Sequence, residues 1–267
     1  MSAEKGGGDF QGVGILHTSE IATEVGVHPN TVRLYEEWGY LPQIPRSASG
    51  YRQFNTIHLE QMKLARLAFA DPYPGRHVRR SLANLVRLAA SGAYDRAFAA
   101  AHDHQTLVMG ESAQAAAAAG YLQRWVDGTV QADEQLPPLL SGQTADLLQL
   151  TKDTLRHWER NGLITPPRDP GSGYRLYGAE DVGRLRVLRL LTRAGYSTMA
   201  VLRMVRSLDL GRRANLSQLL DLPAEDEDVI YASDRWQTTL RIHEQRASQI
   251  INHLKQMIML VDPPDKA

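Results

Sequence analysis

Residues 31–54 read TVRLYEEWGYLPQIPRSASGYRQF, and residues 154–177 read TLRHWERNGLITPPRDPGSGYRLY. The two stretches align without a gap at a constant offset of 123 positions, so that Thr31 pairs with Thr154. Typical composition predicts about two chance identities over such a length. The further identical pairs are Arg33 with Arg156, Glu36 with Glu159, Gly39 with Gly162, Ser49 with Ser172, Gly50 with Gly173, Tyr51 with Tyr174 and Arg52 with Arg175. The chain therefore contains an internal repeat, and a fold prediction must account for two copies of one plan.

The composition is that of an ordinary globular chain, with 267 residues, 43% hydrophobic and 22% charged. This length is enough for two small domains. The absence of cysteine excludes disulfide bonds and thiolate metal sites. No apolar run approaches the roughly 18 residues of a membrane span, and no charged and apolar leader opens the chain, which favours a cytoplasmic protein. Residues 1–14 are rich in glycine and are predicted to be a disordered tail.

The formal net charge is zero, but the charge is unevenly distributed along the chain. Residues 141–213 contain 13 Lys and Arg against 7 Asp and Glu, whereas residues 221–234 contain 6 acidic residues and no basic one. A basic face and an acidic segment can cancel in the total and still act separately. Nucleic-acid binding is therefore not excluded by the net charge.

Each copy of the repeat begins with a pattern that predicts two short helices joined by a tight turn. In the first copy, Gly26 ends one helix and His28 caps the next, which starts at Pro29. In the second copy, Thr151 is the candidate cap. A helix-turn-helix with so few apolar residues is the common plan of proteins that read the major groove of DNA.

A proline-containing loop and a Gly-Tyr-Arg sequence follow each helix-turn-helix. Gly50 and Gly173 suit a turn that needs a positive φ angle. An aromatic residue and an arginine directly after such a turn predict a wing, which is a small hairpin that reaches the DNA backbone. A further helix is predicted from Thr56 in the first copy and from Ala179 in the second.

Two long helices are predicted from apolar residues that recur at alternating steps of three and four. The first seam consists of Phe98, Ala101, Gln105, Val108, Ser112, Ala115, Ala119, Leu122 and Val126. The second consists of Trp236, Leu240, His243, Ala247, Ile250, Leu254, Met257 and Val261. The predicted fold is mainly α, with two winged helix-turn-helix domains, each followed by a long helix, and with the two long helices forming an antiparallel coiled coil.

The predicted boundaries follow from these patterns. They are a disordered tail at 1–14, the first winged helix-turn-helix domain at 15–92, the first long helix at 93–128, a linker at 129–140, the second winged helix-turn-helix domain at 141–210, an acidic connector at 211–232 and the C-terminal coiled-coil helix at 233–262.

The order Thr-x-Arg-x-aromatic-Glu, then Gly, then Gly-Tyr-Arg-x-aromatic resembles the signature of the MerR family of bacterial transcription regulators. The resemblance covers both copies and most of the chain apart from the tail and the linkers. It implies a winged helix-turn-helix, a dimerisation helix, and binding to double-stranded promoter DNA that is bent and untwisted to help RNA polymerase. Proteins of this family ordinarily carry one DNA-binding unit in each chain, whereas this chain carries two.

The doubled unit leads to a hypothesis about the oligomeric state. If the two long helices pair antiparallel, the roughly dozen linker residues can span the distance back to the second unit. We therefore expect a monomeric pseudo-dimer that reads a two-part, imperfectly symmetric site. A homodimer that carries four DNA-binding units is the competing arrangement.

Candidate DNA-binding residues are polar or aromatic side chains on the second helix of each unit and on each wing. In the first copy they are Asn30, Thr31, Arg33, Tyr35, Arg46, Tyr51 and Arg52, and in the second they are Lys152, Thr154, Arg156, Trp158, Arg168, Tyr174 and Arg175. Tyr35 and Trp158 fit a role in the core equally well. Glu36 and Glu159 would repel phosphate, so they are expected to form internal salt bridges that orient arginines.

Enzyme function is not expected, and no cofactor or metal is predicted. His102 and His104 do not share a helical face, and no phosphate-binding glycine loop or nucleophile motif is present. A small-molecule effector would have to sit between the units, against aromatic residues that are alternatively core: Tyr94, Tyr121, Trp125, Tyr231 and Trp236. An architectural DNA-bending protein and a protein-interaction scaffold remain alternatives to a sequence-specific regulator.

Overall fold

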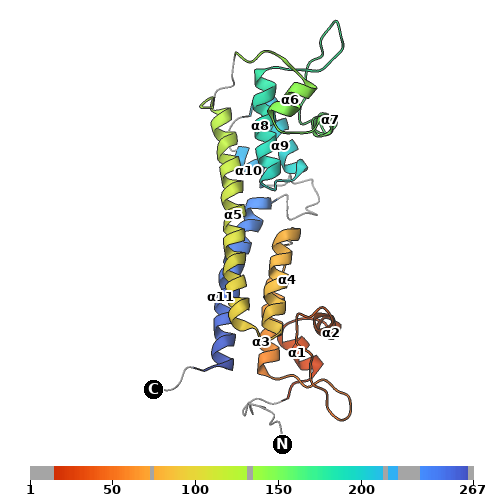
Figure 1. Cartoon of the computed structure of the whole chain (residues 1–267), viewed down its shortest axis with the longest axis vertical. Helices are drawn as coiled ribbons and strands as arrows, with labels where there is room; N and C mark the ends of the chain where they lie inside the picture. Colours follow the sequence, from red (N-terminus) through yellow and green to blue (C-terminus); the bar gives the residue numbers. More distant parts are fainter. Residues whose placement is uncertain (1–14, 73–74, 131–134, 213–215, 222–234, 264–267) are drawn as a thin grey trace, which may run out of the picture. The chain divides into compact units, whose positions relative to one another are not determined.

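The computed structural model describes residues 15–72, 75–130, 135–212, 216–221 and 235–263, and these residues are mainly helical (Figure 1). The chain divides into two compact units. Unit 1 comprises Met1–Val108 with His243–Ala267, and unit 2 comprises Met109–Ile242. The predicted tail at 1–14 and most of the acidic segment, including Tyr231, lie outside the described residues.

Unit 1 contains a first group of helices that we call head 1, namely α1 (Thr18–Glu24), α2 (Pro29–Glu37), α3 (Thr56–Ala68) and α4 (Arg76–Ala90). Helices α1 and α2 contact each other, as do α3 and α4. Unit 2 contains the corresponding head 2, namely α6 (Ser141–Leu147), α7 (Lys152–Arg160), α8 (Ala179–Arg193) and α9 (Thr198–Asp209).

Each head begins with two short helices in contact with each other, and the turn between them has the chemistry that the sequence pattern predicts. Gly26 ends the first helix with a φ of +65°. The Nδ1 atom of His28 accepts the N–H of Asn30 at 3.1 Å and so caps α2. In head 2, the hydroxyl of Thr151 accepts the N–H of Thr154 at 3.0 Å and caps α7.

A hairpin follows the second helix of each head. In head 1, Arg46 pairs with Arg52 in an antiparallel bridge, and the N–H of Ser47 donates to the carbonyl of Tyr51 at 2.8 Å. In head 2, Arg168 pairs with Arg175. Hairpin 1 is defined as residues 45–53 and hairpin 2 as residues 167–176.

The gapless offset of 123 positions is wrong inside the hairpins. The N–H of Gln53 donates to Pro45, whereas the N–H of Leu176 donates to Pro167, so the first strand of hairpin 2 is displaced by one position. Hairpin 2 is one residue longer at its turn, and this insertion restores the offset before Arg175. The carboxylate of Asp169 accepts N–H groups of the longer turn, which lowers the pKa of that carboxyl through its hydrogen bonds to Ser172.

Two predicted connecting segments contain structure that the sequence patterns missed. Strand β1 (Leu139–Leu140), at the end of the predicted linker, pairs antiparallel with β2 (Leu176–Tyr177) and ties hairpin 2 to the start of α6. Helix α10 (Leu216–Leu219) lies within the predicted acidic connector, and Leu216 is buried in the core of unit 2. The sequence patterns did not reveal these leucines because the residues around them are mostly polar.

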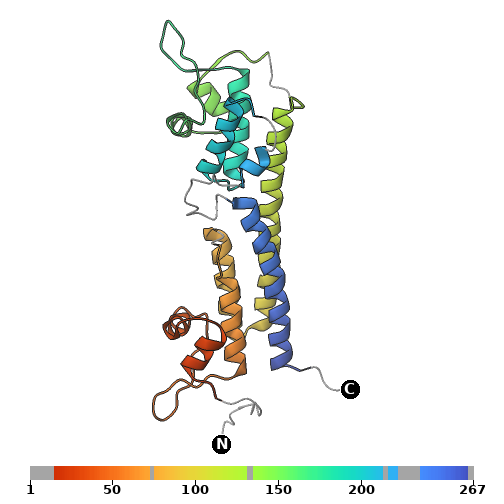
Figure 2. The same ribbon diagram turned by 180° about the vertical axis from the view of Figure 1, so that it is seen from behind.

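The two long helices are α5 (Tyr94–Val126) and α11 (Trp236–Val261). Within unit 1, Gln105 donates to Ser248 at 3.2 Å and the ammonium of Lys255 lies 5.9 Å from the centre of the Phe98 ring. Because position rises along one helix as it falls along the other, these portions of α5 and α11 run antiparallel, as both views show (Figures 1 and 2). The predicted seam residues of α11 are buried except for Val261, which is 36% exposed.

The long helices α5 and α11 each contribute to both compact units. Each compact unit contains one head together with a portion of α5 and a portion of α11. In unit 2, the hydroxyl of Tyr196 in head 2 donates to the carbonyl of Ala115 on α5 at 3.1 Å, and Gln237 on α11 donates to the same hydroxyl at 2.6 Å. Each head is therefore held by both long helices.

In unit 1, α11 holds the loop between α3 and α4 through buried polar side chains. Arg246 donates to the carbonyls of Ala70 and Asp71 at 2.8 and 2.7 Å, and the Nε2–H of His243 donates to the carbonyl of Pro72 at 3.0 Å. Burial lowers the pKa of His243 to about 4, with Arg246 adding to the effect. Burial, with His243 and Arg246 nearby, likewise lowers the pKa of His104 to about 4.

In unit 2, an aromatic side chain holds the corresponding loop, which lies between α8 and α9. The indole N–H of Trp236 donates to the carbonyl of Ala194 at 2.6 Å. The ring lies so close to Gly195 that an added Cβ atom would be 2.7 Å from the indole nitrogen.

Among the described residues, none of the helices combines the length and the apolar character that crossing a lipid bilayer requires.

Candidate nucleic-acid interface

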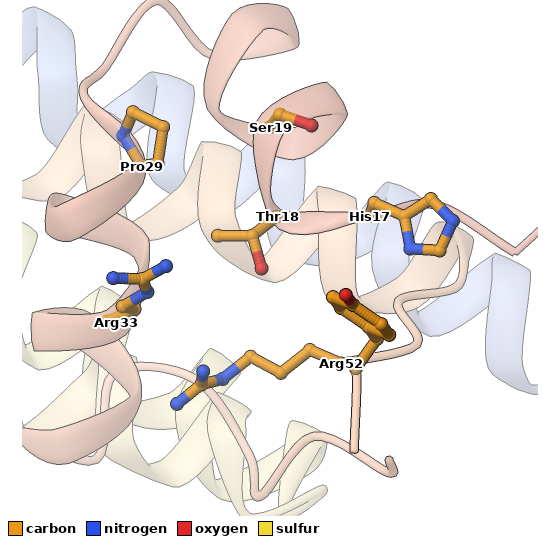
Figure 3. Close-up of a pocket in the computed structure, with 7 residues that line it drawn as sticks. His17, Thr18, Ser19, Pro29, Arg33 and Arg52 are labelled. Atoms are coloured by element: carbon orange, nitrogen blue, oxygen red, sulfur yellow. The ribbon is translucent and has the colours of Figure 1, made fainter. Parts of the chain in front are cut away.

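A pocket in head 1 lies where the start of α1, the helix α2 and hairpin 1 meet. It is lined by His17, Thr18, Ser19, Pro29, Arg33, Tyr51 and Arg52. Figure 3 shows the guanidinium groups of Arg33 and Arg52 extending toward the same space, with the hydroxyl of Thr18 beside it. Two cations and a hydroxyl on a concave surface are a suitable environment for a phosphate group.

Head 2 has an equivalent pocket, lined by Leu140, Ser141, Gly142, Gln143, Lys152, Arg156, Arg168, Ser172, Gly173, Tyr174 and Arg175. The offset of 123 positions relates the two arginines of the first pocket, Arg33 and Arg52, to Arg156 and Arg175 of the second. The second pocket additionally contains Lys152 and Arg168. The internal repeat therefore produces two polar pockets of the same plan.

A glutamate on the second helix of each head, α2 or α7, fixes the hairpin arginine. Arg52 Nε donates to Glu36 Oε2 at 2.6 Å, and Arg175 Nε donates to Glu159 Oε2 at 2.5 Å. Both partners in head 1 are largely buried, with side-chain exposures of 19% and 14%. The expected internal salt bridges are thus confirmed, and because Nε makes the bond, the terminal nitrogens of the guanidinium are left to meet a ligand.

The same glutamates also tie down neighbouring loop residues. Glu36 Oε1 accepts the backbone N–H of Ile44 at 3.2 Å, whereas Glu159 Oε1 lies 3.8 Å from a terminal nitrogen of Arg168. The hydrogen bond to Arg175 raises the pKa of that guanidinium. Each carboxylate therefore joins the second helix of its head to the hairpin and limits the positions that the hairpin can take.

The start of the first helix in each head is held by a backbone-to-side-chain bond. The backbone N–H of His17 donates to Glu20 at 2.6 Å, and the backbone N–H of Leu140 donates to Gln143 at 2.8 Å. The pocket residues at this helix start were not among the predicted site residues. Their signal was available, because Thr18 and Ser141 occupy equivalent positions beside the predicted helix-turn-helix.

The outer faces of α2 and α7 carry the predicted polar residues. Asn30 and Arg33 are exposed on α2, and Lys152 and Arg156 are exposed on α7. Thr31 and Thr154 are half-buried at the edge of the same faces.

The aromatic candidates divide into two groups. Tyr35 and Trp158 are buried, at 8% and 5% exposure, and belong to the cores of their units, which favours the core alternative for both. Tyr51 and Tyr174 at the hairpin turns are exposed by 69% and 66%.

The remaining hairpin candidates are arginines that fold back on their own turns. Arg46 donates to the carbonyl of Gly50 at 3.4 Å, and Arg168 donates to the carbonyl of Gly173 at 3.2 Å. Both side chains therefore stay beside the hairpin arginines Arg52 and Arg175, but only Arg168 lines its pocket.

The effector aromatics that the structure describes are divided between the cores of the two units. Tyr94 packs against the core of unit 1, and Tyr121 and Trp125 pack against the core of unit 2. Trp125 lies against Gly183, where an added Cβ atom would be 2.8 Å from its indole nitrogen. With Trp236 committed to the Ala194 carbonyl, these side chains have structural contacts that account for them; Tyr231 lies outside the described residues.

Comparison with known proteins finds that both heads are similar to one family. A family profile described as "MerR family regulatory protein" matches residues 17–54, and one described as "MerR HTH family regulatory protein" matches residues 140–208. A mercuric resistance operon regulatory protein of Bacillus cereus is 36% identical over 56 residues, which cover 21% of this chain and 42% of that relative. The chain thus spans about two fifths of that relative's length, and no solved structure matches it.

Proposed function

We propose that this chain, which belongs to the MerR family and carries two units of the family type, regulates transcription by binding promoter DNA in a sequence-specific manner. The observation that carries the proposal is the repetition of one pocket in two heads, each with a recognition-helix arginine and a hairpin arginine that a glutamate orients. Phosphate contacts from these pockets would position each head, and side chains on α2 and α7 would then read base edges.

The DNA target is a two-part site of imperfect symmetry. The recognition helices differ at three outward positions, with Asn30 against Asp153, Leu34 against His157 and Glu37 against Arg160. Asparagine favours adenine and arginine favours guanine in the major groove, whereas aspartate accepts from cytosine. The two halves of the site should therefore differ in sequence, and binding distorts the DNA between them.

The chain binds this site as a monomeric pseudo-dimer. Each compact unit combines one head with portions of both α5 and α11, which supports the idea that one chain supplies what two family protomers ordinarily supply. A homodimer with four heads would instead protect a longer stretch of DNA. The family resemblance further suggests action in the cytoplasm together with RNA polymerase.

An electrophoretic mobility assay with promoter and random DNA at several salt concentrations tests sequence specificity. We expect a preference for promoter DNA that persists as salt rises, because base contacts do not release counterions. Equal affinity for all sequences would instead support an architectural DNA-bending protein, and no binding to either DNA would support a protein-interaction scaffold.

A small-molecule effector is a separate part of the proposal and rests on the aromatic residues beside the long helices. Tryptophan fluorescence during titration with hydrophobic antibiotics tests it, because Trp125 on α5 and Trp236 on α11 both contribute to the packing of unit 2. A saturable change that is lost in Trp125→Phe would support sensing. A flat response across the panel would remove the effector from the proposal and leave the DNA-binding function intact.

A further inference from the structure

The two pockets differ in which cation lacks a carboxylate partner. In head 2, Arg156 pairs with Asp153 at 3.1 Å, and Arg175 and Arg168 both lie near Glu159. In head 1, Arg52 pairs with Glu36. Within the part of the chain that the structure describes, the pocket cations that form no ion pair are Arg33 in head 1 and Lys152 in head 2.

The exchange follows from two coordinated differences in sequence. Asn30 of head 1 is replaced by Asp153 in head 2, which adds the carboxylate that Arg156 bonds. Pro29, which has no charge, is replaced by Lys152. Positions 152 and 156 are one helical turn apart on the same face of α7. Lys152, which lies one helical turn before Arg156, thus replaces Arg156 as the pocket cation without a carboxylate partner.

A third difference makes room for the lysine. Gly142 in head 2 corresponds to Ser19 in head 1. A Cβ atom added at Gly142 would lie 3.2 Å from Lys152 Cε and 3.5 Å from Nζ, so the end of the lysine rests on the start of α6 where head 1 has a side chain. The ammonium is thereby placed in a pocket that also contains three arginines. Four cations on one concave surface favour an anion between them.

We propose that Lys152 is the main phosphate-binding cation of head 2 and that Arg33 is the corresponding cation of head 1. Its ligand is a phosphate diester of the DNA backbone, and this inference rests on the proposed DNA-binding function. Arg156, held by Asp153, is left to face the bases instead. The two heads therefore contact the DNA backbone from positions that differ by one turn of the protein helix. Their half-sites accordingly differ in which phosphate is contacted as well as in base sequence.

The salt dependence of DNA binding tests this assignment. Each phosphate contact contributes a slope of about −0.9 in a plot of log K against log salt concentration. Lys152→Ala and Arg33→Ala should each lower the magnitude of the slope by about one, and each should weaken binding roughly eightfold at 0.1 M salt. Arg156→Ala should lower the slope by clearly less, because Asp153 already balances its charge. Lys63→Ala, which removes a lysine paired with Glu60 outside the pockets, should leave the slope unchanged.

Neutral backbone substitution provides the second arm. A duplex in which methylphosphonate replaces the phosphate contacted by head 2 should weaken binding of the wild-type chain and have no further effect on Lys152→Ala. Competition by inorganic phosphate at constant ionic strength distinguishes a general anion site from a site for the DNA backbone. If inorganic phosphate displaces DNA selectively from the wild-type chain only at molar-scale concentrations, the pocket is a site for a phosphate diester. Strong inorganic phosphate binding at millimolar concentration would contradict the diester assignment.

The results that would overturn the inference are distinct from those that would overturn the proposed function. If the wild-type chain binds no DNA, the proposed function fails. If the wild-type chain binds promoter DNA but Lys152→Ala has the wild-type slope while Arg156→Ala loses about one, the function stands and the assignment of Lys152 is wrong. Circular dichroism of each variant verifies folding, which is expected because Lys152 is exposed.

Discussion

The two units share the parts that would touch DNA and differ in the parts that hold each head in place. The glutamate–arginine pair and the pocket beside it occur in both heads. In contrast, the loop after α3 is held by His243 and Arg246, whereas the loop after α8 is held by Trp236. The two copies have kept the same pocket and glutamate–arginine pair, whereas the contacts between each head and α11 differ.

The difference arises because the two loops meet different portions of α11. A buried guanidinium and imidazole are costly to desolvate unless carbonyls accept their hydrogens, and the loop carbonyls of unit 1 do so. Within the described residues, the Nδ1 atom of His243 has no hydrogen-bond partner. The indole of Trp236 combines one hydrogen bond with a large apolar surface. Unit 1 should therefore respond to acid, and unit 2 to changes in packing.

The largest expected effect is the acid sensitivity of unit 1. Because the pKa of His104 and of His243 is about 4 in the folded chain, the unfolded chain binds protons from pH 6.5 downward while the folded chain does not. Stability should be full above pH 6.5 and fall progressively toward pH 4, by up to roughly 3 kcal/mol for each histidine. Denaturant unfolding followed at several pH values measures this.

Unit 2 supplies the internal contrast for the acid experiment. Its single histidine is the exposed His157, and burial raises the pKa of the Asp181 carboxyl, so that this group favours the folded state as pH falls. Amide hydrogen exchange should show protection lost first in unit 1. Earlier loss of protection in unit 2, or a wild-type pH dependence in His104→Gln, would contradict the role of the buried imidazoles.

The next largest effect concerns the packing of Trp236 on unit 2. Gly195→Ala would put a Cβ atom 2.7 Å from the indole nitrogen at a residue with a φ of +92°. Backbone strain and overpacking together should destabilise the chain by roughly 2–4 kcal/mol. Gly211→Ala, at a φ of +74° with nothing within 4 Å, is the matched control and should cost only about 1 kcal/mol. Equal shifts of the thermal midpoint in both variants would remove the packing argument.

A smaller effect tests the shared geometry. Arg52→Lys and Arg175→Lys keep the charge but cannot hold a glutamate and a phosphate at once, because an ammonium lacks the planar fork of a guanidinium. Each should weaken DNA binding by about 1 kcal/mol with an unchanged salt slope. Fluorescence anisotropy with labelled promoter DNA measures both. A large loss in one variant alone would mean that the two pockets do not have the same role.

The repeat predicted most of each head, because the caps, turn glycines and charged pairs are local features that recur. Glu36 and Glu159 could be assigned to salt bridges since an acidic residue beside arginines has few other uses near DNA. The extra residue of hairpin 2 could not be seen, because the shortened loop before it cancels the shift in the alignment.

Long-range packing was the weaker part of the prediction. The imidazole of His243 is an unusual side chain for an apolar seam, yet its hydrogen bond to the carbonyl of Pro72 makes its burial favourable, and no periodicity encodes that acceptor. Tyr35 and Trp158 combine an aromatic signature with an inward helical face, and only their burial separates core from contact. Leu216 in α10 was hidden because a four-residue helix shows too little periodicity to recognise.

We propose that one chain supplies both halves of a dimeric DNA reader. Size-exclusion chromatography with light scattering on the complex with the minimal two-part site tests it most directly. We expect the mass of one 29.7 kDa chain plus one duplex, and a cleavage footprint of the same complex should show both halves of the site protected. A complex that contains two chains on that minimal site would contradict it.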